Sequence, residues 1–218
     1  MKCIYCNHSI VYKLNTKQLK CAKCKRKFSP KKIARKKAII ECFCDNLTAN
    51  QTHKKLHIHY KTILKEYQNI RKYIAYFLEQ NYNQNSVTSY DEYIYLEKSK
   101  KIESKNIFDA KNFLTFEYDG KIYNLLLFDL SRYKQEFLND GIDETYFKEF
   151  SRYMMLNKIA KIQHKENLIQ RFWAFFEENI VKYKGINKDN FFYYLKELEF
   201  KFNYSKDEQK VILNKFLY

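Results

Sequence analysis

Apolar side chains recur every three or four residues in the first third of the chain, and this spacing predicts helices with one buried face. One such segment runs from Lys32 to Asp45, and another runs from Lys61 to Phe77. Between them we predict a short helix from Thr48 to Leu56, with the Thr48 side chain as its N-cap. The last two helices would be joined by a tight turn at His57–Tyr60. This order predicts a helix-turn-helix, with two packed helices of a basic scaffold as the alternative.

The pattern changes after a polar stretch from Asn81 to Ser89, which we interpret as a linker. Tyr90–Leu96 reads as a strand, and two apolar runs between Lys111 and Asp129 flank an Asp119-Gly120 pair, which is typical of a β-hairpin turn. Helical spacing returns later, in residues 143–156, 166–183 and 187–202. Strands followed by helices predict an α+β or α/β domain in this part of the chain.

Composition excludes several classes of protein. Hydrophobic residues make up 45% of the 218 residues, and 20 Tyr and 18 Phe are present, whereas Gly and Pro occur only 3 times and once. The chain is therefore not disordered or collagen-like. No apolar run approaches the roughly 20 residues of a membrane helix, and the start of the chain has no apolar signal core. We therefore expect a soluble, intracellular protein that does not enter a membrane.

The positive charge is concentrated at one end of the chain. Residues 1–72 contain 19 Lys and Arg against 3 Asp and Glu, whereas residues 73–218 contain 22 of each kind. The whole formal charge of +16 thus belongs to the first third. Such a basic segment favours a nucleic-acid partner, because each Lys or Arg that neutralises a phosphate releases counterions. A membrane surface is the alternative, but these residues do not follow one amphipathic helix.

Four cysteines near the N-terminus have the spacing of a metal site. Two Cys-x-x-Cys pairs, Cys3/Cys6 and Cys21/Cys24, are separated by fourteen residues that include a hairpin-like stretch. Four thiolates form the closed tetrahedral shell of structural zinc, so the pattern predicts a zinc ribbon. Disulfides or a redox pair are the alternatives, but an intracellular chain would not keep disulfides and a redox motif would not be duplicated.

The other cysteines and the histidines do not fit a metal site. Cys42 and Cys44 lack the spacing of a knuckle, and we expect them to be small buried residues in a helix. The three histidines near residue 57 have no cysteine or carboxylate at ligand spacing, so we interpret them as polar helix and turn positions: His53, His57 and His59.

The order of these segments resembles the zinc-ribbon DDE transposases of bacterial insertion sequences. The resemblance covers nearly the whole chain, and besides the paired knuckles it depends on three stretches: Tyr90-Asp91-Glu92-Tyr93, Asn167-Leu-Ile-Gln-Arg-Phe-Trp173 and Tyr194-Leu-Lys-Glu-Leu-Glu-Phe-Lys-Phe-Asn203. It implies an RNase H-like α/β domain in which three carboxylates hold two Mg²⁺ or Mn²⁺ ions for phosphodiester cleavage and transfer. It also implies a bacterial cytoplasmic protein, associated with the nucleoid, that multimerises on the terminal inverted repeats of double-stranded DNA.

Carried over residue by residue, the resemblance assigns catalytic positions to Asp91, Asp140 and Gln170. Asp91 matches the first metal ligand, and Asp140 is preferred over Asp129 and Asp143 for the second. Gln170 stands where the family has its third acid. A neutral amide brings no charge to a two-metal site, so this departure weakens catalysis, and the alternative function is a decayed transposase that only binds DNA. Glu166, one helical turn earlier, is the candidate replacement.

These inferences give a multidomain α+β protein. The predicted domains are a zinc ribbon (1–30), a helix-turn-helix domain (31–80), a linker (81–89) and an RNase H-like domain (90–218). We expect its DNA contacts to come from the second knuckle and from the start of the second helix: Lys25, Arg26, Lys27, Tyr60, Lys61, Thr62 and Lys65. A zinc-ribbon transcription or RNA-associated factor is a third reading.

Two groups in the C-terminal part have more ordinary interpretations. The aromatics around Trp173 are expected in the core rather than stacked on DNA. Four lysines there are expected to line target DNA or to form a solvated face: Lys182, Lys184, Lys196 and Lys201.

Overall fold

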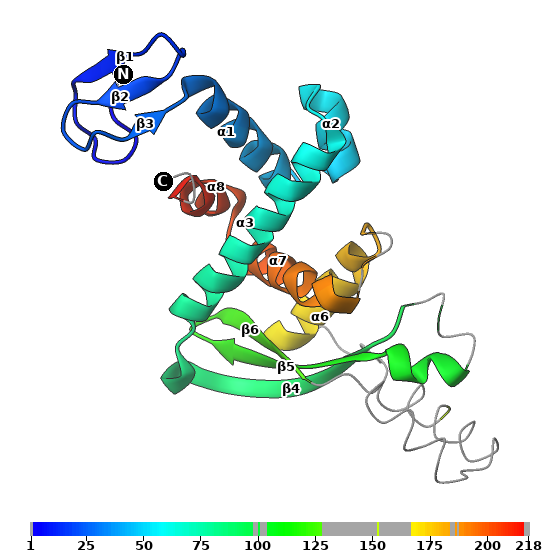
Figure 1. The fold of residues 1–218 in the computed structure, drawn as a ribbon. Coiled ribbons are helices and arrows are strands. Elements are labelled where there is room, and N and C mark those ends of the chain that lie inside the picture. The colour runs from blue at the N-terminus through cyan, green and yellow to red at the C-terminus, as the bar shows by residue number, and fades with distance from the viewer. Residues whose placement is uncertain are drawn as a thin grey trace, which may run out of the picture. The chain divides into compact units, whose positions relative to one another are not determined.

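The computed structural model describes residues 2–97, 100, 104–127, 152, 167–183, 186 and 188–215. Within them the chain has mixed α+β structure and two three-stranded sheets (Figure 1). It divides into two compact units, one formed by Met1–Phe77 with Tyr204–Tyr218 and the other by Leu78–Asn203. None of the helices in the described part is long and apolar enough to cross a membrane.

The first unit begins with a small antiparallel sheet. Strands β1 (Val11–Lys13), β2 (Leu19–Cys21) and β3 (Lys27–Phe28) pair in the order β1-β2-β3. The predicted hairpin thus forms, and a third short strand extends it. Its core holds only a few side chains around Cys3, Cys21 and Phe28. So small a core offers little hydrophobic stabilisation by itself.

Three helices follow the sheet: α1 (Pro30–Cys44), α2 (Ala49–Leu56) and α3 (Tyr60–Asn81). They lie close to the expected limits, although α3 runs four residues past Phe77. Most of the apolar positions that predicted α1 and α3 are buried, namely Ile39, Ile40, Phe43, Ile63, Tyr67, Ile70 and Ile74, whereas Ile33 and Ala38 in α1 are half-buried. Cys42 and Cys44 are also buried in α1, as expected.

The last described helix of the chain, α8 (Lys206–Lys215), also belongs to the first unit. It packs against α1, and Lys206 forms an ion pair with Asp45 at the C-terminal end of that helix. The sequence did not predict this helix. The expectation that residues 90–218 form one domain is therefore not met, because the end of the chain returns to the first unit.

The second unit contains an antiparallel sheet in the order β4-β5-β6, formed by β4 (Val87–Tyr95), β5 (Lys111–Tyr118) and β6 (Lys121–Leu126). Asp119 and Gly120 join β5 to β6 with φ angles of 46° and 69°, the left-handed conformation that the predicted hairpin turn needs. Short 3₁₀ helices span Gln84–Ser86, Ser104–Asp109 and Lys188–Asn190. The predicted linker is thus partly structured, since β4 already begins at Val87.

Helices α6 (Leu168–Ile180) and α7 (Phe191–Asn203) cover one face of this sheet (Figure 1). The core between them is dominated by rings, including Tyr93, Phe113 and Trp173. Placement of the Trp173 region in the core is therefore confirmed. The helix predicted at residues 143–156 lies outside the described residues, apart from Arg152 in a helical conformation.

Candidate metal centre and nucleic-acid interface

The four N-terminal cysteines come together in space. One Sγ from each of Cys3, Cys6, Cys21 and Cys24 lies within 4.8 Å of the others, and no other such group of His, Cys, Asp and Glu occurs among the described residues. The Sγ atoms of Cys3 and Cys24 are 3.6 Å apart, and those of Cys6 and Cys21 are 3.5 Å apart. Close pairs therefore join the two knuckles, as ligands of one ion would.

Each knuckle is closed by the same backbone arrangement. Asn7 and Lys25, which directly follow the second cysteine of each pair, have left-handed φ angles of 56° and 59°. Their N–H groups donate to the carbonyl oxygens of Cys3 and Cys21, at 3.0 and 3.2 Å. Left-handed residues of this kind reverse the chain tightly, so the two thiols of each pair project to the same side.

Backbone donors shape the ionisation of the thiols. Burial raises the pKa of Cys21, but hydrogen bonds from the Cys24 N–H, the Cys6 thiol and the Lys23 N–H outweigh it and lower this pKa to about 6. For Cys24, the N–H of Arg26 lowers the pKa, whereas burial and the neighbouring thiols raise it to about 11. The first thiol thus ionises readily, and its negative charge opposes ionisation of the neighbouring thiol. A bound cation would offset this repulsion and allow both to ionise.

A metal ion such as zinc fits this cluster. Four thiolates complete a tetrahedral shell and leave no open position for substrate, so the ion would have a structural role. Cys3 and Cys21 are buried, whereas Cys6 reaches the surface. Because the surrounding core is small, binding of the ion would supply much of the free energy that folds the ribbon.

Basic side chains surround this site without acidic neighbours in sequence. Lys25, Arg26 and Lys27 are all exposed. The Arg26 guanidinium lies 5.0 Å from the centre of the Tyr5 ring, which in turn meets Phe28 edge-on. A guanidinium held over a ring keeps a defined direction and can still donate to a phosphate.

A buried hydrogen-bonded chain fixes the angle between α2 and α3. The Tyr67 hydroxyl lies 2.6 Å from the Thr52 hydroxyl and donates to the carbonyl oxygen of Leu47 at 2.9 Å. At the start of α2, Thr48 and Gln51 form a reciprocal capping box. His57 supplies the turn with a φ of 52°, the conformation for which glycine is more usual.

The residues predicted to contact DNA at the start of α3 lie on a helix face that carries both basic and apolar side chains. Tyr60, Lys61 and Lys65 are exposed, and Thr62 is half-buried. Leu64, on the same exposed side, was not predicted. Positions one turn apart share a helix face, so Lys61 and Lys65 lie one above the other. This arrangement suits a helix that meets a polyanion at its N-terminal end.

The predicted catalytic positions are only partly comparable with the structure. Asp91 is an exposed residue in the middle of β4, and its carboxylate accepts a hydrogen bond from the N–H of Glu92. Gln170 lies in the first turn of α6, where its N–H donates to the Asn167 side chain. Asp140 and Glu166 lie outside the described residues.

Strand register shows which face of β4 carries Asp91. Asp91 is paired with Thr115 on β5, and the Thr115 hydroxyl accepts a hydrogen bond of 2.9 Å from the indole of Trp173. Trp173 lies one turn after Gln170 on the same helix. The face of β4 that carries Asp91 is therefore the face that α6 covers. No cluster of three acidic groups is formed there by residues that the structure describes.

A buried ion pair lies beneath β6 and was not predicted. Lys196 Nζ contacts Glu199 Oε2 at 3.0 Å, with both side chains at most 1% exposed. The same carboxylate oxygen accepts hydrogen bonds from the backbone and side-chain N–H groups of Asn124. Burial raises the pKa of Glu199, and Lys196 and Asn124 oppose that effect.

This pair changes the interpretation of the C-terminal lysines. Lys196 is buried and also stacks on the Tyr123 ring at 3.7 Å, and the Lys201 side chain pairs with Glu197 at 2.6 Å. The expectation that these two lysines face DNA or solvent is therefore wrong. The three-residue spacing of Lys196 and Glu199 was the only signal in the sequence, and it equally fits an exposed helix face.

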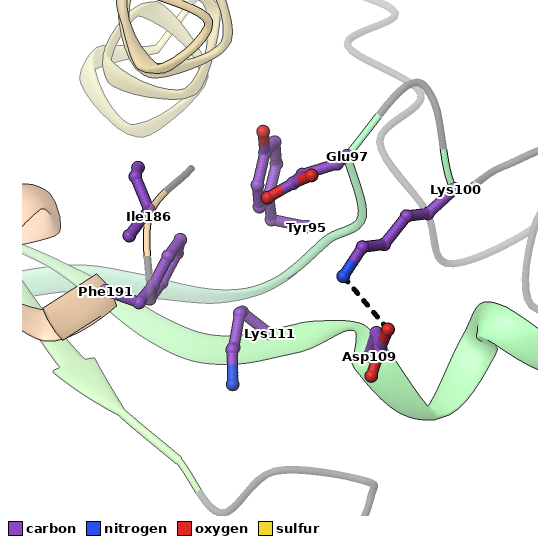
Figure 2. A pocket seen from close by; sticks show the side chains of 7 residues that line it. All are labelled: Tyr95, Glu97, Lys100, Asp109, Lys111, Ile186 and Phe191. Carbon is purple, nitrogen blue, oxygen red and sulfur yellow. Dashed lines mark hydrogen bonds and ion pairs between the residues drawn. The ribbon is translucent and has the colours of Figure 1, made fainter. Parts of the chain in front are cut away.

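Figure 2 shows a small cavity in the second unit, lined by side chains that include Tyr95, Glu97, Lys111 and Phe191. Its volume is about 30 Å³, and an ion pair of 2.9 Å between Lys100 and Asp109 lies at its side. Such a volume holds about one water molecule. The cavity is therefore too small for an organic substrate.

No family model, curated protein or solved structure matches this chain in the comparisons. Its function is therefore inferred from its own residues and their geometry.

Proposed function

We propose that this chain is a DNA-binding protein of the transposase type, which recognises the ends of a mobile element through its N-terminal unit. The observation that carries the proposal is the cluster of four cysteine sulfurs within 4.8 Å, followed after α1 by two helices, α2 and α3, that a short turn at His57 joins. The positive charge supports the same conclusion, because the entire surplus of 16 lies in the first 72 residues.

In this proposal the two parts of the unit have different tasks. The first turns of α3 enter the major groove, where Tyr60, Lys61 and Lys65 contact bases and phosphates. The ribbon, folded around zinc, adds charge beside them. Multimerisation on two element ends is part of the same proposal.

Binding measurements with substituted protein test the role of α3. Lys61→Gln/Lys65→Gln is expected to weaken binding of a duplex from the element end by roughly tenfold or more at 0.1 M salt, because two phosphate neutralisations are lost. The matched control is Lys210→Gln/Lys215→Gln, which removes the same charge from α8. Equal effects of the two substitutions on affinity would contradict a specific role for α3.

Strand cleavage is the second candidate activity. The observation that favours it is that Asp91 lies on the sheet face against which α6 packs, and α6 is the helix that carries Gln170. In this proposal Asp91 and Asp140 would hold Mg²⁺ or Mn²⁺, which would stabilise charge on the attacking and leaving oxygens. Water would displace the 3′-oxygen at the cleaved bond, and the freed 3′-hydroxyl would then displace the 3′-oxygen of a phosphodiester in the target strand. The neutral Gln170 would weaken the hold on the second ion.

A metal-dependent nicking assay distinguishes an active enzyme from a decayed one. Cleavage by the native protein that Asp91→Ala abolishes would support catalysis. Cleavage that occurs only after Gln170→Glu would identify a chain that has lost its third acid. Binding without cleavage in both forms would contradict the catalytic proposal and leave DNA binding in place.

A further inference from the structure

The ribbon sheet has an outer face that the zinc site does not use. Val11, Leu19 and Phe28 point toward the cysteine core. Directly paired residues share the other face, and there Tyr12 is paired with Lys20, which is paired in turn with Lys27 on the third strand. The three strands thus carry one continuous row from Tyr12 to Lys27.

This row is open to solvent. Tyr12 is 57% exposed, Lys27 is exposed and Lys20 is half-buried. The Tyr12 hydroxyl and the two ammonium groups are hydrogen-bond donors. All three side chains therefore offer donors to a ligand on this face.

The pairing of Lys20 with Lys27 is unfavourable for the ribbon alone. Directly opposite side chains have Cβ atoms about 5 Å apart, and like charges in such positions destabilise a sheet. Residues 1–40 contain 13 Lys and Arg and no Asp or Glu, so the ribbon has no carboxylate of its own to separate the two charges. An external anion between the two ammonium groups would turn this repulsion into attraction.

We propose that Tyr12, Lys20 and Lys27 form a second DNA-contact surface, which binds the phosphate backbone of a duplex independently of the base sequence. The inference rests on the proposed DNA-binding function and adds a named surface to it. Phosphate contacts position a protein without reading bases, so the ribbon would add affinity and α3 would add discrimination.

Fluorescence anisotropy with the zinc-loaded full chain tests this division of roles. The probes are a duplex from the element end and a scrambled duplex of equal length, each titrated over a series of salt concentrations. Lys20→Gln/Lys27→Gln should weaken binding of both duplexes by the same factor, roughly tenfold or more at 0.1 M salt, and reduce the slope of log K against log salt by about 2. Lys210→Gln/Lys215→Gln, on α8, is the control and should leave the slope unchanged.

Two further variants distinguish a lost DNA contact from a ribbon that fails to fold. Zinc content is measured for each protein, and if the double variant binds less zinc, Lys27→Gln alone should reduce the slope by about 1. Tyr12→Phe, which removes only the hydroxyl, should lower the affinity for both duplexes severalfold.

The outcomes separate this inference from the proposal on which it rests. A native protein that binds neither duplex at low salt overturns the DNA-binding function itself. Native binding with an unchanged slope in zinc-loaded Lys20→Gln/Lys27→Gln overturns only the surface proposed here. A loss confined to the element-end duplex would also overturn it, because a backbone contact cannot depend on sequence in that way.

Discussion

Cysteine takes two roles in this chain, and position decides between them. The four knuckle cysteines bring their thiols together as candidate metal ligands. Cys42 is instead a buried side chain of α1, and burial raises the pKa of its thiol. The spacing of the knuckles predicted the metal cluster from sequence because both thiols of each pair lie on one short turn. No tertiary information is needed to bring such neighbours together.

Removal of one knuckle thiol should therefore abolish metal binding. Cys21→Ser is expected to reduce bound zinc from about one ion per chain to near zero, since three thiolates hold the ion less tightly and the ribbon has little other core. Atomic absorption of the purified protein measures this. Cys42→Ala is the matched control and should retain its zinc; equal zinc in both variants would contradict the assignment.

The burial of the Lys196 side chain could not be predicted from the sequence. Lysines scattered along a helix usually form a solvated face, but Lys196 pairs with Glu199 on its own helix, and Glu199 in turn binds Asn124 on a distant strand. Only the packing of α7 against β6 brings them together. A pattern of apolar positions does not reveal which polar side chain is enclosed by such packing.

Breaking the buried pair should be costly. Lys196→Met leaves the Glu199 carboxylate without its counter-charge and is expected to lower the free energy of unfolding by about 3–5 kcal/mol. Urea denaturation measures the change. The exposed Lys182→Met should stay within about 0.5 kcal/mol of the native value, and a loss of under 1 kcal/mol for Lys196→Met would show that the pair contributes little.

At the scale of elements, the sequence predicted the long helices and the hairpin well and the junctions poorly. The Asp119-Gly120 turn has a backbone requirement that few residues meet, so its signal is local. The predicted linker overlaps the first three residues of β4, because Thr88 and Ser89 are polar and Val87 stands alone among polar neighbours. They enter β4 through tertiary pairing, for example the Ser89 hydroxyl bond to Glu117.

Helix α8 was missed because its evidence is tertiary. It contains only three apolar residues, and Asp45, its ion-pair partner, lies in another part of the sequence. Hydrogen bonding and charge from Lys206 lower the pKa of Asp45 below its usual 3.8. This contact therefore stabilises the fold above pH 3.8 and loses its effect as the pH falls through the lower, folded-state pKa.

Asp45→Asn should reveal this dependence. At pH 7 the substitution is expected to cost about 0.5 kcal/mol, a small value because the Lys206 side chain is 55% exposed and solvent screens the pair. The difference between native and variant should shrink as the pH falls below 3.8. Urea denaturation at pH 7 and pH 3 checks this, and a cost that grows with acidity would contradict the sign.

At the scale of the whole molecule, the chain leaves the first unit, builds the second, and returns. The second unit begins at Leu78, a few residues before the polar stretch from which we predicted a change of domain. The return at Tyr204 could not be foreseen, because composition does not change there. The N-terminal unit consequently depends on residues at the far end of the sequence.

Leu213 on α8, which is fully buried, tests that dependence. Leu213→Ala is expected to destabilise the first unit by about 2–5 kcal/mol through lost burial and the cavity left behind. Hydrogen exchange should show faster exchange in α1, while amides of β5 stay protected. Equal loss of protection in both elements would mean that the two units unfold as one.

The most direct test of the account is binding of element-end duplex DNA by the native chain, measured by anisotropy with and without zinc. We expect binding that weakens steeply with salt, is lost when a chelator removes the metal, and returns when zinc is restored. Absence of binding by the zinc-loaded protein at low salt, or binding indifferent to both zinc and salt, would contradict it.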